Sequence, residues 1–127
     1  MRPEQAVNVQ ATQDGKGRGL VSTQHVRAND IILGCPCIED ETVAFQNSVA
    51  IDYVFEHPDK KGNSVLPFGM CALANHSDDP NSTWDFHETQ SPPLMYIRAT
   101  RPIQPGEEVL LDYGAQYWSS RPQLHKK

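Results

Sequence analysis

The sequence predicts a single, mostly β domain made of several small sheets, with few and short helices. Short runs rich in branched and aromatic residues alternate along the chain with turn residues, a pattern typical of strands joined by tight loops. The 127 residues include 8 glycines and 10 prolines, and no linker or low-complexity tract separates them into parts. A chain of this length buries one core, so residues 1–127 are expected to form one domain.

The N-terminal half is expected to hold strands around one glycine-rich turn. "AVNVQAT" (6–12) alternates like a half-buried strand, and "LVST" follows as a second strand after the turn "QDGKGRG". "DIILGCPCI" (30–38) is typical of a buried strand in which Pro36 marks a bulge or an edge. "VAIDYVFEH" (49–57) mixes branched and aromatic residues and is also expected to be a strand.

The C-terminal half is expected to hold one helical turn and three strands. "PFGMCALAN" (67–75) lacks strand alternation and predicts the short helical turn. "STWDFHE" and "LMYIRAT" are expected to pair across the loop "TQSPP", and "RPIQPGEE" is a turn that leads into the strand "VLLDYG". The tail "GAQYWSSRPQL" is expected to be a helical turn followed by an extended end.

The N-terminus and the cysteine count predict an intracellular protein. "MRPEQAVNVQATQDGKGRG" has no apolar run for a secretion signal, and no later segment approaches the roughly 18 apolar residues of a membrane span. We therefore expect no secretion, no membrane partner and no glycan on the sequons at Asn75 and Asn81. Three cysteines, an odd number, fit reduced thiols in a cytosol-like compartment.

Neither a metal nor a nucleic acid is expected as a ligand. Cys35-x-Cys37 has the wrong spacing for a zinc knuckle, and the five histidines form no ligand pair. The net charge of −5 disfavours a phosphate backbone as partner and suits a basic peptide.

Two motifs are ambiguous when each is considered alone. "GKGRG" lets backbone groups approach a ligand closely, but it is neither a Rossmann fingerprint nor a P-loop, and a plain hairpin turn explains it better. In "GEEVLLDYGAQYW" (106–118), Glu107 and Glu108 are expected to be solvated turn charges. A tyrosine at a strand end beside glycine can point its hydroxyl into a cavity, although any single tyrosine is more often a core residue.

The order of these pieces resembles the SET domain of protein lysine methyltransferases, from Gly15 to Trp118. "GKGRGL" is similar to the family's G-x-G-hydrophobic loop, "LANHSDDPN" to its N-H-S-C-x-P-N motif, and "PGEEVLLDYG" to its G-E-E-L-x-x-D-Y segment. The closest likeness is to the short stand-alone SET enzymes of chlorella viruses. Those share the length, the Cys-x-Cys strand, an Asp-Tyr before the "FG" helix and an ending like "YWSSRPQL".

The resemblance implies a binding site for S-adenosylmethionine and a C-terminal pseudoknot, in which the Asn-His-Ser loop is threaded under the C-terminal segment. In the family this loop holds the cofactor, and the glycine-rich turn contacts it through its backbone. The implied cofactor-binding residues are Lys16, Gly17, Arg18, Asn75, His76 and Trp118. Arg18 departs from the family, in which an aromatic residue is frequent in this loop.

The resemblance makes Tyr113 the catalytic residue, near the transferring methyl and the lysine amine. The amine must be neutral to attack, and a reference pKa near 10.4 leaves roughly one part in a thousand neutral near pH 7.4. A dry aromatic channel disfavours the charged amine once bound, and its walls attract the incoming cation. The implied channel residues are Tyr53, Tyr117, Leu111 and Tyr96; Tyr96 lies in mid-strand and is as well explained as a core residue.

The implied activity is S-adenosylmethionine-dependent lysine N-methylation of a basic protein, such as a histone tail. Asp78 replaces the motif cysteine of many relatives and no cysteine follows Tyr113, so neither a zinc-binding post-SET segment nor any metal is expected. The resemblance also allows a homodimer, and a viral source would place the protein in the cytoplasm or nucleus of a host cell. The alternative is a SET-like module that has lost turnover and only binds peptide or cofactor.

Overall fold

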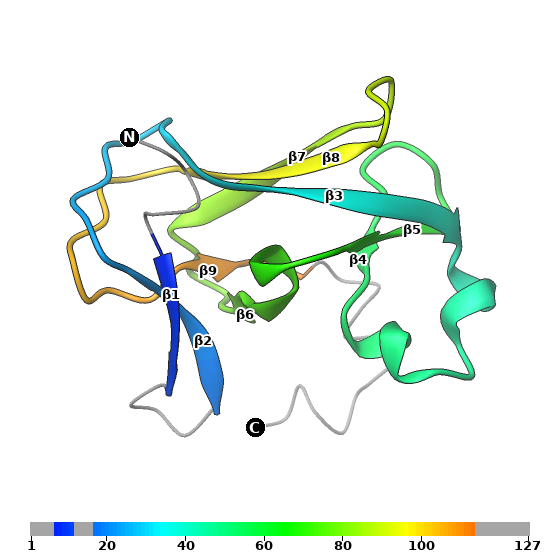
Figure 1. The fold of residues 1–127 in the computed structure, drawn as a ribbon, viewed down its shortest axis with the longest axis horizontal. Coiled ribbons are helices and arrows are strands. Elements are labelled where there is room, and N and C mark those ends of the chain that lie inside the picture. Colours follow the sequence, from blue (N-terminus) through cyan, green and yellow to red (C-terminus); the bar gives the residue numbers. More distant parts are fainter. Residues whose placement is uncertain (1–6, 12–16, 114–127) are drawn as a thin grey trace.

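The computed structural model describes residues 7–11 and 17–113, which form nine strands and three single-turn 3-10 helices. The strands are β1 (Val7–Ala11), β2 (Arg18–Ser22), β3 (Ile31–Glu41), β4 (Phe55–Glu56), β5 (Asn63–Pro67), β6 (Asn75–His76), β7 (Ser82–His87), β8 (Leu94–Ala99) and β9 (Leu110–Leu111). The helical turns are η2 (Thr42–Phe45), η3 (Val49–Asp52) and η4 (Met70–Leu73). Within these ranges each helix is too short to cross a membrane. The predicted mostly β fold with few short helices is confirmed (Figure 1).

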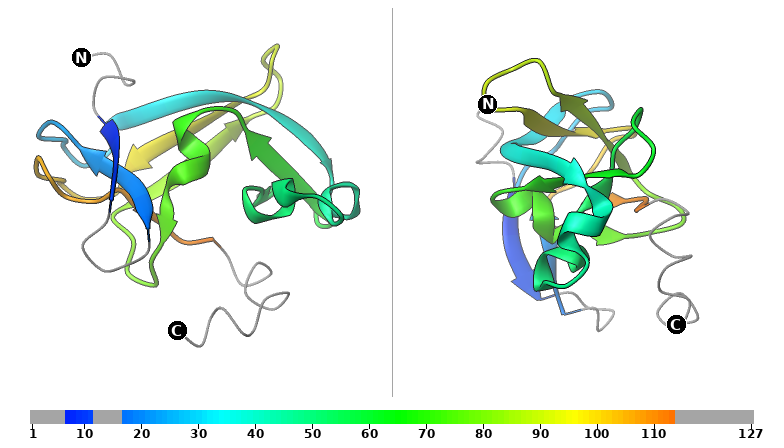
Figure 2. Two further views of the ribbon diagram at one scale, coloured as in Figure 1. Left: turned by 60° about the horizontal axis from the view of Figure 1, so that its bottom comes forward. Right: turned by 90° about the vertical axis from the view of Figure 1, so that its right-hand side faces the viewer.

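The strands form three small sheets. The largest is antiparallel with the order β4-β5-β3-β8-β7, the second is the β1–β2 hairpin, and the third is the parallel pair β6–β9. Figures 1 and 2 show the hairpin beside one end of the long strand β3 and the turns η2 and η3 at the other end. β3 pairs with β8 as far as Pro36 and with β5 from Cys37 onward, so one strand joins the two halves of the sheet.

One apolar core lies between the sheets. Strand β8 shows the expected alternation, because Met95, Ile97 and Ala99 are fully buried while the residues between them are only half-buried. The core includes Val7, Leu20, Ile32, Leu33, Val65, Met95, Ile97, Val109 and Leu111. Burying a large aliphatic side chain contributes roughly 1.5 to 3 kcal/mol, so this core fixes the position of β9 and of the residues that follow it.

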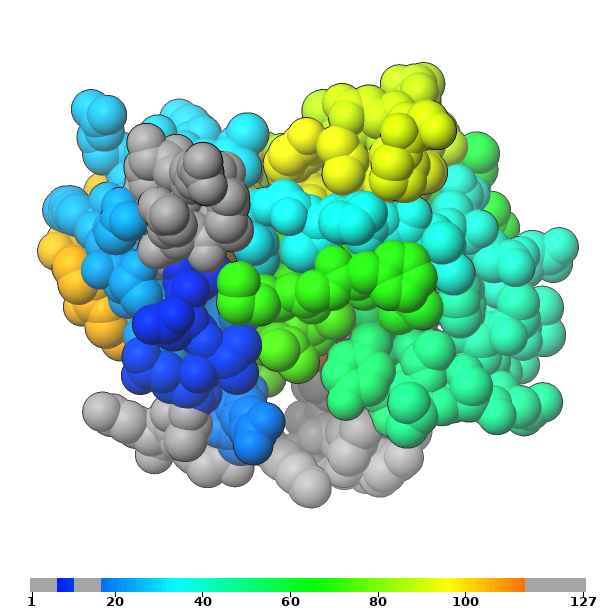
Figure 3. All heavy atoms as spheres, in the orientation of Figure 1, coloured from blue at the N-terminus to red at the C-terminus, as the bar shows by residue number. Residues whose placement is uncertain are grey.

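The turn η4 is held against β3 by two buried cysteines. The backbone N–H of Cys71 donates to Sγ of Cys35 at 3.4 Å, and Gly69, with φ of 111°, brings the chain close to the same sulfur. On the face shown in Figure 3 the hairpin (blue) lies beside the segment around η4 (green), and β2 contacts η4. Cys35, Cys37 and Cys71 are all free, as the odd count predicted. This packing positions the segment that runs from η4 into β6.

Two local predictions are corrected by the structure. Residues 49–57 are not one strand: η3 precedes the two-residue strand β4. The reason is local capping, because the side chain of Ser48 accepts the N–H of Ala50 at 3.2 Å and starts a helical turn. Of the two alternatives for Pro36, the bulge is wrong, since the register shift of β3 lies between Ile31 and Leu33; Pro36 instead marks the point at which the pairing of β3 changes from β8 to β5. The predicted helical turn in 114–124 lies outside the described residues.

Candidate active site

The parallel pair β6–β9 brings the Asn-His-Ser loop to the strand end that carries Tyr113. Asn75 lies opposite Leu110 and His76 opposite Leu111, and the N–H of Ser77 donates to the Leu111 carbonyl at 2.9 Å. The predicted pseudoknot depends on this crossing. The segment that would complete it follows residue 113 and is outside the described part of the chain.

Asn81 holds β9 in place, a role that the sequence analysis missed. Its side-chain Oδ1 accepts the N–H of Leu110 at 2.9 Å and its Nδ2 donates to the Glu108 carbonyl at 2.8 Å. The residue is 1% exposed, so these bonds replace water completely. A single asparagine thus pairs with the backbone of β9 as a neighbouring strand would. Its only signal in the sequence is its place as the last residue of "NHSDDPN", where it was considered as a sequon.

Asn75 connects the glycine-rich turn to the turn before β9. Its Nδ2 donates to the Arg18 carbonyl at 3.0 Å and to Glu108 Oε2 at 2.7 Å. Glu108 is therefore not a purely solvated turn charge, which corrects the sequence-based expectation. Because an amide nitrogen carries two hydrogens and both are donated, Asn75 can offer a ligand only its side-chain oxygen, as an acceptor.

Tyr113 is bound at two points by the segment 74–76. Its hydroxyl donates to the Ala74 carbonyl at 2.5 Å, and its backbone N–H donates to Nδ1 of His76 at 3.0 Å. The His76 and Tyr113 ring centroids are 5.3 Å apart, and Phe55 packs edge-on against Tyr113 at 5.8 Å. The tyrosine side chain is consequently fixed in position and direction.

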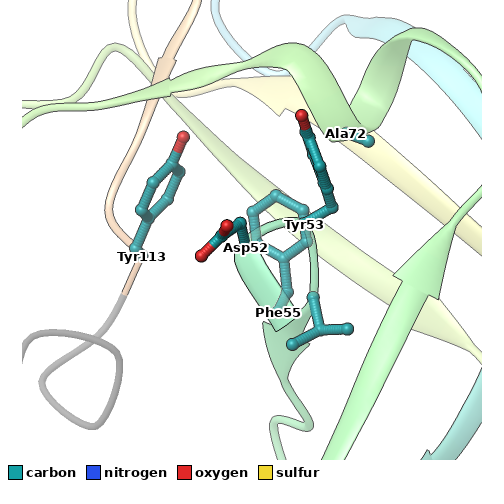
Figure 4. A pocket seen from close by; sticks show the side chains of 6 residues that line it. Asp52, Tyr53, Phe55, Ala72 and Tyr113 are labelled. Carbon is teal, nitrogen blue, oxygen red and sulfur yellow. The ribbon is translucent and has the colours of Figure 1, made fainter. Parts of the chain in front are cut away.

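A small open pocket of about 180 Å³, part of it open to solvent, lies beside Tyr113. It is lined by Asp52, Tyr53, Val54, Phe55, Ala72 and Tyr113. Figure 4 shows Tyr53 and Tyr113 on opposite sides of it, with both hydroxyl groups pointing the same way and the Asp52 carboxylate between the rings. Four of these lining residues, Asp52, Val54, Phe55 and Ala72, were not predicted as site residues. The first three lie in "VAIDYVFEH", which was interpreted as a strand, and Ala72 lies in the predicted helical turn 67–75.

The structure brings together some of the predicted channel residues and separates others. Tyr53 and Tyr113 line the same pocket. Leu111 is fully buried in the apolar core. Tyr96 lies on β8 across Gly34 of β3, where a Cβ would come within 2.8 Å of its ring, and contacts His87 edge-on at 5.0 Å. Tyr96 is thus on the sheet face opposite Met95 and Ile97, away from this pocket. Tyr117 lies outside the described residues.

A hydrogen bond from Asn75 joins two of the segments expected to bind the cofactor, the glycine-rich turn and the Asn-His-Ser loop. Gly17 has φ of 88°, and a Cβ there would have no described atom within 4 Å. Arg18 follows at the start of β2, and its carbonyl accepts a hydrogen bond from Asn75. Lys16 and Trp118 are outside the described ranges.

A second polar cluster lies away from this site, between β3, β4 and the β7–β8 turn. His57 Nε2 is 3.8 Å from Glu39 Oε1 and 3.7 Å from Glu88 Oε2, and the three side chains have the spacing of metal ligands. However, Nδ1 of His57 accepts the N–H groups of Asp59 and Lys60, both at 2.9 Å. Neutral imidazole with an accepting Nδ1 carries its proton on Nε2, which leaves no lone pair for a metal.

Lys60 supplies the cation of this cluster. Its Nζ is 3.0 Å from Glu88 Oε2 and 3.6 Å from Glu39 Oε2. The hydrogen bond from Lys60 lowers the pKa of Glu88, and the same bond raises the pKa of Lys60. The cluster is therefore best explained as an ion-pair network that ties the strands together.

Comparison with known proteins gives the family. A model of the SET domain matches residues 17–114. The chain is 23% identical over 107 residues to histone-lysine N-methyltransferase SET9 of Yarrowia lipolytica, an alignment that covers 84% of this chain but only 12% of that protein.

Two solved structures share the fold. A crystal structure of a candidate histone methyltransferase of Plasmodium falciparum superposes with a TM-score of 0.69 at 28% identity, covering 90% of this chain and 97% of that one. A humanised mutant of Chaetomium thermophilum Polycomb Repressive Complex 2, bound to the inhibitor GSK126, gives a TM-score of 0.67 at 18% identity, over 87% of this chain and 15% of that one. With a family match over most of its length, the chain belongs to the SET domain family.

Proposed function

We propose that the protein is an S-adenosylmethionine-dependent protein lysine N-methyltransferase with Tyr113 as its catalytic residue. The observation that carries this proposal is a connection made by two hydrogen bonds on adjacent residues. Asn75 donates to the Arg18 carbonyl, and the neighbouring His76 accepts the N–H of Tyr113, which lines the pocket with Tyr53. This connection supports a cofactor loop that lies next to a lysine pocket.

The pocket has the chemistry that a lysine side chain requires. Its tyrosine and phenylalanine rings and the Asp52 carboxylate attract the cationic amine of a lysine side chain. The Tyr113 hydroxyl gives its hydrogen to the Ala74 carbonyl, so toward a substrate amine it would act as an acceptor and not as a donor. An acceptor beside an amine N–H orients the nitrogen lone pair, and such orientation is what in-line attack on a methyl group depends on.

The cofactor would be held by chain segments that Asn75 joins. Bound S-adenosylmethionine supplies the methyl group. Gly17 and Arg18 would contact it through their backbone, Asn75 through its side-chain oxygen and His76 through its backbone, with Lys16 and Trp118 completing the site. No metal enters this scheme.

The substrate is proposed to be a basic protein segment such as a histone tail. The net charge of −5 and the Asp52 carboxylate in the pocket favour a cationic partner over nucleic acid. Two relatives are named as histone methyltransferases, which supports an intracellular, nuclear site of action. We further propose that residues 1–127 are one SET domain of the chlorella-virus type, able to form a homodimer.

Two experiments test this function. The first measures methyl transfer from radiolabelled S-adenosylmethionine to mixed histones. The second measures S-adenosylmethionine binding by calorimetry in the presence of excess chelator. Incorporation into histone lysines together with chelator-resistant cofactor binding is expected. Cofactor binding without incorporation into histones or lysate proteins would favour the inactive binding module. The absence of both would contradict the proposal.

A further inference from the structure

Residues 74–76 bind Tyr113 both at its backbone N–H and at its side-chain hydroxyl. The backbone N–H of Tyr113 donates to His76 Nδ1, a residue 37 positions away in the sequence, and the hydroxyl donates to the Ala74 carbonyl. The last described backbone bond of β9 to this segment is that from Ser77 to the Leu111 carbonyl. Beyond Leu111 the His76 side chain therefore takes the place of a strand partner and fixes the backbone from which the tyrosine projects.

Only one form of the imidazole ring can make these contacts. Because Nδ1 accepts a hydrogen bond, the proton of neutral His76 is on Nε2. Nε2 in turn lies 2.8 Å from Asp78 Oδ1, an acceptor suited to that proton. Asp78 occupies the position at which many relatives carry cysteine, so this chain has an acceptor that stabilises the tautomer with an unprotonated Nδ1.

We infer that the His76 side chain is a positioning residue for Tyr113, in addition to any contact that its backbone makes with the cofactor. The inference rests on the proposed function, since Tyr113 must act on the methyl group for its position to matter. A displacement of about 1 Å in such a group can cost roughly a hundredfold in rate. The loss of the Nδ1 acceptor is therefore expected to lower kcat, with little effect on the KM for the peptide.

Two substitutions of His76 distinguish the roles of its two ring nitrogens. His76→Asn keeps an acceptor on the atom next to Cγ, where Nδ1 stands, and loses the group that reaches Asp78. His76→Gln does the reverse, because its amide lies one bond further out. At saturating cofactor we expect kcat of His76→Asn to stay within about tenfold of wild type and that of His76→Gln to fall roughly a hundredfold. His25→Gln, at an exposed position after β2, is the matched surface control.

The second measurement needs no substitution and no turnover. In ¹⁵N-labelled protein, the hydrogen bond predicts a scalar coupling between the Tyr113 amide nitrogen and His76 Nδ1, and ring shifts of the Nε2–H tautomer. Equal kcat values for the Asn and Gln variants, or a coupling that is absent at neutral pH, would overturn the inference. If the coupling is present but the protein transfers no methyl groups, the proposed function is rejected, while His76 is still shown to fix the position of Tyr113.

Discussion

The Tyr113 hydroxyl donates its hydrogen to the Ala74 carbonyl, with 2.5 Å between the two oxygens. Ala74 is 1% exposed and comes directly after η4, which Cys71 anchors to β3. The hydroxyl is therefore held by a buried segment that is anchored to the largest sheet. Having given away its hydrogen, it can only accept any further hydrogen bond.

Tyr113→Phe is expected to reduce methyl transfer by at least about two orders of magnitude, because alignment at the reacting methyl is lost. Cofactor affinity should stay within a few-fold. The ring keeps its contacts with Phe55 and His76, so the free energy of unfolding should change by no more than roughly 1 kcal/mol, the value of one hydrogen bond. Single-turnover kinetics, calorimetry and chemical denaturation measure the three quantities.

Tyr53→Phe is the control for this experiment. Tyr53 lines the same pocket but is 42% exposed, so as a wall it should lose less activity than Tyr113. Near wild-type rates for both folded variants would show that neither hydroxyl takes part in methyl transfer, and would contradict the assignment of Tyr113 as the catalytic residue.

Asn75→Ala is expected to weaken S-adenosylmethionine binding by roughly 1 to 3 kcal/mol, the cost of leaving a buried polar partner unsatisfied. The substitution removes the side-chain oxygen and also the bonds to Arg18 and Glu108 that keep the glycine-rich turn near the loop. Isothermal calorimetry on the folded variant measures the loss. Glu108→Gln keeps an acceptor for Asn75 and should bind the cofactor almost as wild type does. An unchanged affinity for Asn75→Ala would show that this asparagine is only structural.

Asn81→Ala is expected to lower the free energy of unfolding by about 2 to 5 kcal/mol, since two buried backbone groups of β9 lose their partners. Urea denaturation followed by fluorescence measures the change. Asn63→Ala is the comparison, because Asn63 is half-buried and donates one bond to Glu39. If the two substitutions lower the free energy of unfolding by the same amount, Asn81 does not have the special role of holding β9 in place.

The Lys60–Glu88 pair is expected to stabilise the fold only over a defined pH range. The pKa of Glu88 is lowered by Lys60, so its contribution is present above about pH 4.3, the unfolded value, and is lost as pH falls through the folded one. The pKa of Lys60 is raised. Its contribution to stability is therefore present below about pH 10.4, its pKa in the unfolded chain, and is lost as the pH rises through its pKa in the folded protein.

Glu88→Gln should therefore lower Tm slightly between about pH 5 and 10 at low salt, and less at high salt, because both side chains are exposed enough to be screened. Thermal unfolding across pH and ionic strength measures this. Glu41→Gln, at the exposed end of β3, is the control. A difference in Tm that persists at pH 3 would show that the effect of Glu88 is not ionic.

Several elements could be predicted from sequence because their signals are local. The alternation in β1, β7 and β8 and the glycines around β2 gave strands close to their observed bounds. The helical turn at η4 was likewise visible as a loss of alternation. In contrast, the strand predicted for residues 49–57 was wrong, because the helix cap at Ser48 outweighs the strand propensity of the residues that follow it.

By itself the sequence determined the fold class, the family and the two segments that meet at Tyr113, since each of these is encoded in contiguous motifs. Only the tertiary structure decided which atoms meet there: that Glu108 receives Asn75, that Asn81 binds β9, and that the Nδ1 of His76 accepts Tyr113. It also separated Tyr96 from the pocket that Tyr53 and Tyr113 share. The physical reason is that periodicity reports which face of an element is buried. The partner of a polar atom is instead set by the crossing of segments about 30 to 40 residues apart, which no local pattern encodes.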